Sequence, residues 1–240
     1  VQIDTPHGRV SGAGLWAATG LEAQRQDAGS AGFLKLDAAI DHLPATQLAR
    51  YLPSSVSTQA LSCLDASLQG GQLNDVTVRI NSELDKSVWH GGAARFAVSA
   101  NAADIALDYA ADWGRDQQWP ALNKLSARFA MNGPEIDITN ITGRLRDAPG
   151  VVVSDASVGI RGLDGSGQLT VDVVAAGPLP VWLAQLNSTP IARWSDGLMQ
   201  DWQAGGDASL RLRVDAPLGQ PEQVVVTGQV ALLGNSLQLW

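Results

Sequence analysis

Apolar and polar residues alternate along most of the chain, which is the period-two pattern of a β-strand with one apolar and one polar face. In the clearest case, Val76, Val78 and Ile80 are separated by polar residues. Clusters such as Asn132-Gly-Pro and Asp164-Gly-Ser-Gly, which favour turns, lie between the alternating runs. The pattern therefore predicts a mainly β chain built as an antiparallel meander. The other alternating runs are residues 105–109, 125–131, 136–138, 169–173, 210–214 and 224–226.

Two segments replace this alternation with the 3.6-residue spacing of an amphipathic helix. The first begins at Leu43-Pro44 and stops at Gly70-Gly71, and the second runs from Leu179-Pro180 to Gly205-Gly206. We expect two short helices in each segment. In the second, the four-residue spacing of Trp194, Leu198 and Trp202 predicts that the helix continues to that point.

The two helical segments and the strands that follow them lie about 135 positions apart, in the same order. The spacing predicts an internal repeat whose units each contain several strands. We expect residues 1–42 to be strands entering from an upstream part of a longer chain, residues 43–178 to be the first repeat unit, and residues 179–240 to be the truncated start of a second unit.

Composition narrows the class of protein. The 240 residues are 45% hydrophobic, so the chain can bury a substantial core. The net charge of −8 and the scattered positions of the 16 basic residues argue against nucleic acid as a partner. No apolar run approaches the roughly 20 residues needed to span a bilayer, so we expect any membrane anchor to lie outside these residues.

No combination of residues predicts catalysis, a metal site or a cofactor. His7, His42 and His90 lack partners at the spacing of a metal motif, and no nucleophile elbow or phosphate-binding loop occurs. Cys63, the only cysteine, lies among leucines and is interpreted as a buried structural thiol. The chain is therefore predicted not to be an enzyme.

Eight tryptophans, against three Phe and two Tyr, leave one alternative open. Trp182, Trp194 and Trp202 lie in the second helical segment, where core packing is expected. Trp89, Trp113 and Trp119 flank strands, and exposed rings there could bind sugars. A carbohydrate-binding or adhesive envelope module is therefore the alternative function.

Several segments together resemble a known family. They are Leu43 to Pro53, Gln69-Gly-Gly71 with its following strand, Trp119-Pro-Ala-Leu122, the strands 125–131 and 136–145, and Gly177-Pro-Leu-Pro180. This set resembles the YhdP-like members of the AsmA-like, TamB-related, bridge-type lipid transfer proteins of the Gram-negative envelope. The resemblance covers most of the chain from about residue 33 onward, and none is noted for residues 1–32.

The resemblance implies an elongated, curled antiparallel β-sheet with short helical insertions, forming an open, taco-like groove. It implies a periplasmic location, attachment to the inner membrane by a helix outside these residues, and a groove that shields phospholipid acyl chains between the inner and outer membranes. It brings no enzyme activity, no cofactor and no identified partner protein.

We therefore predict that the apolar strand positions point into one continuous lipid groove. The alternation alone is equally typical of strands that pack together in a closed sandwich core. The predicted groove residues are Val76, Val78, Ile80, Phe96, Val98, Ile105, Leu107, Leu125, Phe129, Met131, Ile136, Ile138, Val171, Val173, Leu210, Leu212 and Val214.

Overall fold

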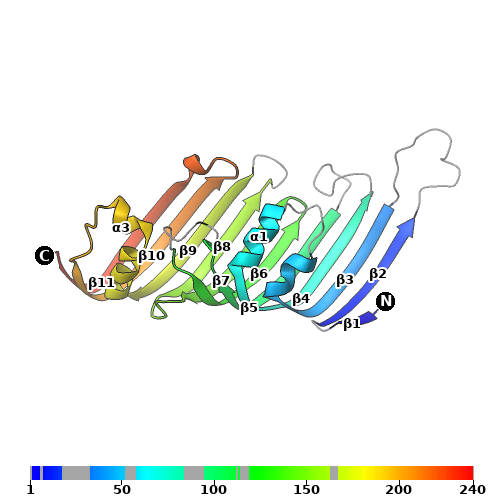
Figure 1. The fold of residues 1–240 in the computed structure, drawn as a ribbon, viewed down its shortest axis with the longest axis horizontal. Helices are drawn as coiled ribbons and strands as arrows, with labels where there is room; N and C mark the ends of the chain where they lie inside the picture. Colours follow the sequence, from blue (N-terminus) through cyan, green and yellow to red (C-terminus); the bar gives the residue numbers. More distant parts are fainter. Residues whose placement is uncertain are drawn as a thin grey trace.

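The computed structural model describes residues 2–5, 8–17, 33–51, 58–83, 95–111, 113, 119–162 and 167–239. These residues form one open sheet in which every strand pairs antiparallel with its neighbours in sequence, in the order β1 to β11 (Figure 1). The prediction of a mainly β, antiparallel sheet with short helices is confirmed. The strands are β1 (Gln2–Thr5), β2 (Gly8–Ala17), β3 (Phe33–Pro44), β4 (Leu68–Glu83), β5 (Arg95–Leu107), β6 (Leu122–Asn132), β7 (Glu135–Leu145), β8 (Val152–Arg161), β9 (Gln168–Pro178), β10 (Gln203–Pro217) and β11 (Val225–Gln238).

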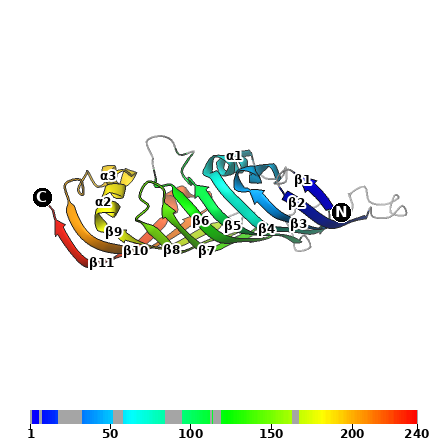
Figure 2. The same cartoon turned by 90° about the horizontal axis from the view of Figure 1, so that it is seen from below.

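Two helical insertions lie on one side of this sheet, as the view in Figure 2 shows. The first, between β3 and β4, contains the 3-10 helix η2 (Ala45–Tyr51) and the helix α1 (Thr58–Ser67). The second, between β9 and β10, contains α2 (Leu179–Asn187) and α3 (Pro190–Trp194). A further 3-10 turn, η3 (Pro221–Gln223), precedes β11.

The insertions begin and end where local sequence requires it. Strand β3 runs through Leu43 and Pro44, so the first insertion starts at Ala45. In the second, Thr189 accepts a hydrogen bond from the backbone N of Ile191 and caps α3, with Pro190 at the first helical position. The predicted continuation of a helix to Trp202 is wrong, because Asp196 and Gly197 adopt left-handed φ values of 49° and 72° and residues 195–201 form turns.

A line of β-bulges crosses the middle of the sheet. Asp75, Asp104, Lys124 and Asn140, one each on β4, β5, β6 and β7, have φ between 50° and 55°. Each lies at a shift in strand register. The extra residue moves the apolar positions of the strand from one parity to the other, so that Ala102 and Ile105 both remain on the same face. Bulges also bend strands, which suits the curved sheet in Figure 2.

The core consists of apolar clusters between the insertions and the sheet. Leu43, at 1% exposure, packs with Val76 and Ala100 under Leu48 of η2. Val151, at 0% exposure, packs with Leu145 under Trp182 of α2. The core therefore follows the helix-bearing side of the sheet and extends along it.

Candidate functional site

A continuous row of apolar residues crosses the helix-bearing face at right angles to the strands. Residues directly opposite each other on paired strands point to the same face. The pairing can be followed from β3 to β10 without a break, and every member of the row is apolar. The row is Ala38, Val78, Val98, Met131, Ile136, Ile160, Leu169 and Ala216.

A second row runs beside the first, two residues further along each strand. It begins on β5 and reaches the edge strand β11. Its members are Ala100, Phe129, Ile138, Val158, Val171, Val214 and Val226. Seven strands thus contribute a large or small apolar group at the same level, and the two rows together form an apolar strip.

The strip is covered to different extents along its length. The insertion that contains η2 packs over Val76 and Ala100, which are buried. From β7 to β10 the strip residues, apart from Ala216, are half-buried. On β11, Val226 and Val230 are 60% and 62% exposed. Aliphatic side chains that keep this much exposure on a sheet face have no fully packed partner within the part of the chain that the structure describes.

The sequence-predicted groove residues all fall on this face, but they divide into two sets. The larger set lies in or beside the apolar strip, and its accessible members could touch a ligand. The smaller set lies in the buried core: Val76, Ile105 and Leu125 pack directly against the first insertion. Phe96 and Met131 are also buried. Contact between these residues and lipid stays a prediction.

The predicted groove residues include none from β8 or from the edge strand β11, although residues 224–226 were expected to alternate as a strand. Val158 and Ile160 of β8 lie between Ile138 and Val171 and between Ile136 and Leu169, so the strip would be interrupted without them. The run Val158-Gly-Ile160 carries the alternation that could have identified them. Val230 of β11, opposite Leu210, was also missed.

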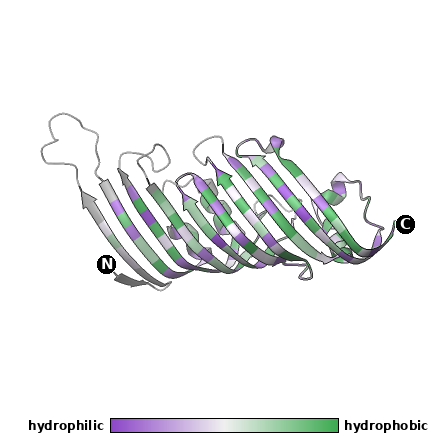
Figure 3. Ribbon diagram, turned by 180° about the vertical axis from the view of Figure 1, so that it is seen from behind, coloured by the Kyte–Doolittle hydropathy of each residue, from purple (hydrophilic) through white to green (hydrophobic). Residues whose placement is uncertain are grey.

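The opposite face of the sheet is polar and held by ion pairs. Arg213 of β10 lies 3.0 Å from Asp172 and 2.8 Å from Asp215, and Thr170 donates a hydrogen bond to Asp215 at 3.1 Å. The hydrogen bond from Arg213 lowers the pKa of Asp215 below its ordinary 3.8. A similar cluster joins Arg161 to Asp137 at 2.6 Å. In Figure 3, which looks at the sheet from behind, hydrophobic and hydrophilic bands alternate along the strands.

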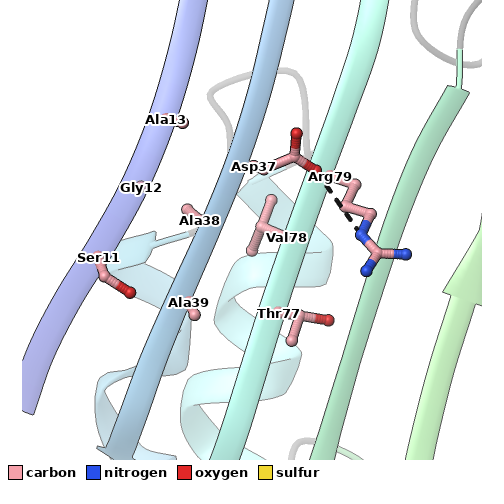
Figure 4. Close-up of a pocket in the computed structure, with 9 residues that line it drawn as sticks. All are labelled: Ser11, Gly12, Ala13, Asp37, Ala38, Ala39, Thr77, Val78 and Arg79. Atoms are coloured by element: carbon pink, nitrogen blue, oxygen red, sulfur yellow. Dashed lines mark ion pairs between the residues drawn. The ribbon is translucent and has the colours of Figure 1, made fainter. Parts of the chain in front are cut away.

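A shallow hollow over β2, β3 and β4 is lined by small and polar side chains (Figure 4). Asp37 of β3 and Arg79 of β4, which are paired on neighbouring strands, form an ion pair at 3.6 Å beside it. Both side chains are more than half exposed, so the pair contributes little to stability. No catalytic arrangement of side chains surrounds this hollow among the described residues.

Within the described ranges, the cysteine, the metal-binding residue types and the helices add no further site. Cys63 lies in α1 and is half-buried rather than fully buried, so the prediction of a buried thiol is only partly right. Among the described residues, no cluster of three or more His, Cys, Asp or Glu is placed to hold a metal ion. None of the described helices is both long and apolar enough to cross a membrane.

The tryptophans separate into packed and exposed groups. Trp182 and Trp202 pack against the cluster of Leu179, Leu183 and Ala208, as expected. Trp194 was expected in the core but is 72% exposed, and its ring centroid lies 5.9 Å from that of Trp119. Trp89 and the loop residues 163–166 lie outside the described residues.

Comparison with known proteins gives one match. A family model described as YhdP protein matches residues 1–239, and the match therefore also includes residues 1–32, outside the expected resemblance. No curated protein and no solved structure matches the chain.

Proposed function

The chain belongs to the YhdP family, and from this premise we propose that it is a segment of a lipid transport protein of the Gram-negative envelope, whose apolar strip shields phospholipid acyl chains in the periplasm. The two rows of the strip supply an apolar path that runs across the strands. The same proposal attaches the whole protein to the inner membrane through a part outside these residues.

The observation that supports this function most directly is the partial exposure of the strip. A closed sandwich core would bury Ile138, Val158 and Val171 as thoroughly as Leu43, yet these three side chains are only partly buried. Moving apolar surface out of water is favourable by about 0.8 kcal/mol per CH₂, or roughly 12 kcal/mol for a sixteen-carbon chain. A strip of partly exposed aliphatic groups can recover part of that free energy.

The geometry suits passage of lipid rather than tight storage. Aliphatic and small side chains in the strip offer no directional contact, so an acyl chain can move from one strand to the next with little change in free energy. The helical insertions cover the strand ends on one long edge, where Ile105 and Leu125 are buried. The path that we propose therefore follows the two rows where the insertions leave them uncovered, from β7 to β11.

Site-specific photocrosslinking tests this function. A photoreactive residue at Val158 or Val171, on the strip, is expected to crosslink to phospholipid when the chain is incubated with vesicles. The same residue at Ser157 or Asp172, the adjacent positions on the polar face, is the matched control and should stay unlabelled. Equal labelling of the two faces, or no labelling at Val158 and Val171, would contradict the proposal.

Loss of transport provides a second test. A glutamate in place of Leu212 puts a charge beside the path, where desolvation is costly. We expect phospholipid movement to the outer membrane to fail in cells that carry this substitution in the whole protein, while the protein level is unchanged. Normal transport with Leu212→Glu would contradict a path along these strands.

One observation favours the carbohydrate-binding alternative. Trp119 and Trp194 form an adjacent pair of rings with Trp194 largely exposed, and exposed indole faces can stack on sugars. Binding of envelope glycans that is lost in Trp194→Ala, together with no bound phospholipid in native mass spectrometry, would favour this second function.

A further inference from the structure

The helix-bearing face of β7, β8, β9 and β10 is aliphatic throughout. The pairing of these strands places only Ala, Val, Ile, Leu and Gly on that face. Interfaces between proteins normally include about one hydrogen bond per 100–200 Å², and side chains of these types can form none. A hydrocarbon chain makes no hydrogen bonds either, so this face suits an acyl chain better than a protein partner.

The helix α2 covers only part of this face. Its Trp182 packs against a cluster that contains Ala156 of β8 and Ala175 of β9, which are 6% and 3% exposed. Because both alanines are small, the indole of Trp182 is the large group that fills the space beside them. The next residues on the same face, Val158 and Val173, are only partly buried. The cover at the insertion edge therefore ends between the two alanines and the two valines.

A second boundary lies at the opposite edge, where β9 begins and β10 ends. The backbone N of Leu218 donates a hydrogen bond to the carbonyl of Gly167 at 2.6 Å. A Cβ added at Gly167 would lie 2.6 Å from Cδ1 of Leu218, so this leucine side chain covers the glycine. The next residue on this face of β9, Leu169, is only partly buried. The accessible part of β9 thus starts at Leu169.

Two fully accessible rows remain between these boundaries. One contains Ile160 with Leu169, and the other contains Val158 with Val171. Two residues along a strand span about 7 Å, and aliphatic carbons pack at about 4 Å from each other, so each row can hold one hydrocarbon chain beside the other. A third chain would have to lie on the next row, where Ala156 is already covered.

We propose that the acyl path is two chains wide, with Trp182 and Leu218 as its walls, and that its substrate is therefore a lipid with two acyl chains. A single chain would leave one row exposed to water, and a third chain would find no accessible row. The inference rests on the proposed function and adds the number of chains to it. It also assigns to Trp182 the role of limiting that number.

Octanoyl esters of glycerol test the width, because they carry one, two or three identical chains on the same glycerol. Native mass spectrometry with the 240-residue chain compares their affinities. For the wild type, we expect the second chain to tighten binding at least about tenfold, since it buries additional apolar surface. The third chain should change the affinity by less than about threefold, because it stays in water.

Trp182→Leu tests the wall. The smaller side chain should uncover the row of Ala156, so that the third octanoyl chain now tightens binding about tenfold. Trp202→Leu is the matched control, because Trp202 packs against the Leu183 cluster of the same insertion and loses a group of the same size. This control should keep the wild-type pattern. The series of esters with the wild type measures the width even if Trp182→Leu does not fold.

Different results would overturn the inference and the proposed function. Equal affinities of the wild type for the one-chain and two-chain esters, or a third chain that tightens binding as much as the second, would remove the two-chain limit and leave the acyl path intact. A folded Trp182→Leu protein that gains nothing from the third chain would remove Trp182 as the wall. Failure to bind any ester would count against the proposed function itself, and a dimer in those spectra would point to a second copy as the occupant of the strip.

Discussion

Val173 of β9 lies directly opposite Leu212 of β10, on the helix-bearing face, whereas the next residue, Val174, lies opposite Arg211 on the polar face. Two adjacent valines on one strand thus experience opposite environments. Val173 and Val174 therefore provide a matched test of which face of the sheet requires an apolar residue for stability.

We expect Val173→Asp to lower the free energy of unfolding by roughly 2–4 kcal/mol, because the carboxylate replaces an apolar contact on the strip. Val174→Asp, the control, should change it by less than about 1 kcal/mol, since its two opposite neighbours, the cation Arg211 and the anion Asp155, act on the added carboxylate with opposite sign. Urea denaturation of both variants measures the difference. Equal losses of stability would show that the two faces are not distinguished by burial.

Gly143 of β7 is expected to tolerate no larger residue. A Cβ at this position would collide with Cδ2 of Leu125, which is buried under the first insertion. Gly143→Ala should destabilise the protein by about 1–3 kcal/mol through overpacking.

Gly70 of β4 is the control for this substitution, because a Cβ there would meet only the Ala106 Cβ at 3.7 Å, an ordinary contact. Gly70→Ala should change the thermal midpoint little. A Gly143→Ala protein as stable as the wild type would mean that Leu125 can move aside.

The left-handed bulge residue Asn140, with φ of 55°, gives a third prediction. Asn140→Gly should keep or raise stability by up to about 1 kcal/mol, because glycine adopts this conformation without strain. Asn140→Val should lower it by roughly 1–2 kcal/mol, since a β-branched residue is strained there. Chemical denaturation of the two variants measures the difference, and the opposite order of stabilities would argue against the bulge.

Stability should depend on pH through Asp215. The hydrogen bond from Arg213 lowers the pKa of this carboxyl in the folded protein, so the interaction stabilises the fold above the ordinary value of 3.8 and is lost as the pH falls through the lower folded value. The urea midpoint of Arg213→Gln should therefore lie below that of the wild type at neutral pH, and the gap should close below pH 3.8. A gap that persists at low pH would point to packing of the Arg213 side chain instead.

The edge strand β11 should cause self-association. No charged residue lies between Val224 and Leu239, and Val230 and Leu232 are more than half exposed. Long, uncharged edges pair readily with other strands. We expect the 240-residue chain to form concentration-dependent oligomers in light scattering, and the double substitution Val230→Lys, Leu232→Lys to reduce them. Glu222→Lys, which changes the net charge equally outside the strand, should leave them unchanged.

Much of this fold could be predicted from the sequence, because the period-two pattern records which face of each strand is buried. The antiparallel meander followed from this pattern. The positions of the two insertions followed from the Pro and Gly residues that mark where each helical segment begins and ends. Whether Ile105 lies on the same face as Val98 depends on the bulge at Asp104. No residue type in the sequence marks the position of this bulge. The division into repeat units stays a prediction.

The candidate site was harder to predict because burial under the helices is a tertiary effect. Val76 and Val78 are equivalent in the alternation, yet η2 packs over the first and leaves the second only partly buried. Likewise, the sequence gives no sign that Trp182 packs against Ala156 and Ala175, since that depends on the contacts of the folded chain. Residue type therefore predicted the apolar face. Only the fold distinguishes the residues of this face that the helices cover from those that they leave accessible.

The simple neighbour-to-neighbour order of the strands makes the length of this architecture adjustable in fixed steps. Adjacent strands of a sheet lie about 4.8 Å apart, so each added hairpin lengthens the array by about 10 Å. Six strands, β4 to β9, separate the two insertions, and because this number is even both insertions lie at the same edge. Gain or loss of whole hairpins would therefore change the reach of the protein in nanometre steps without moving the helices to the opposite edge.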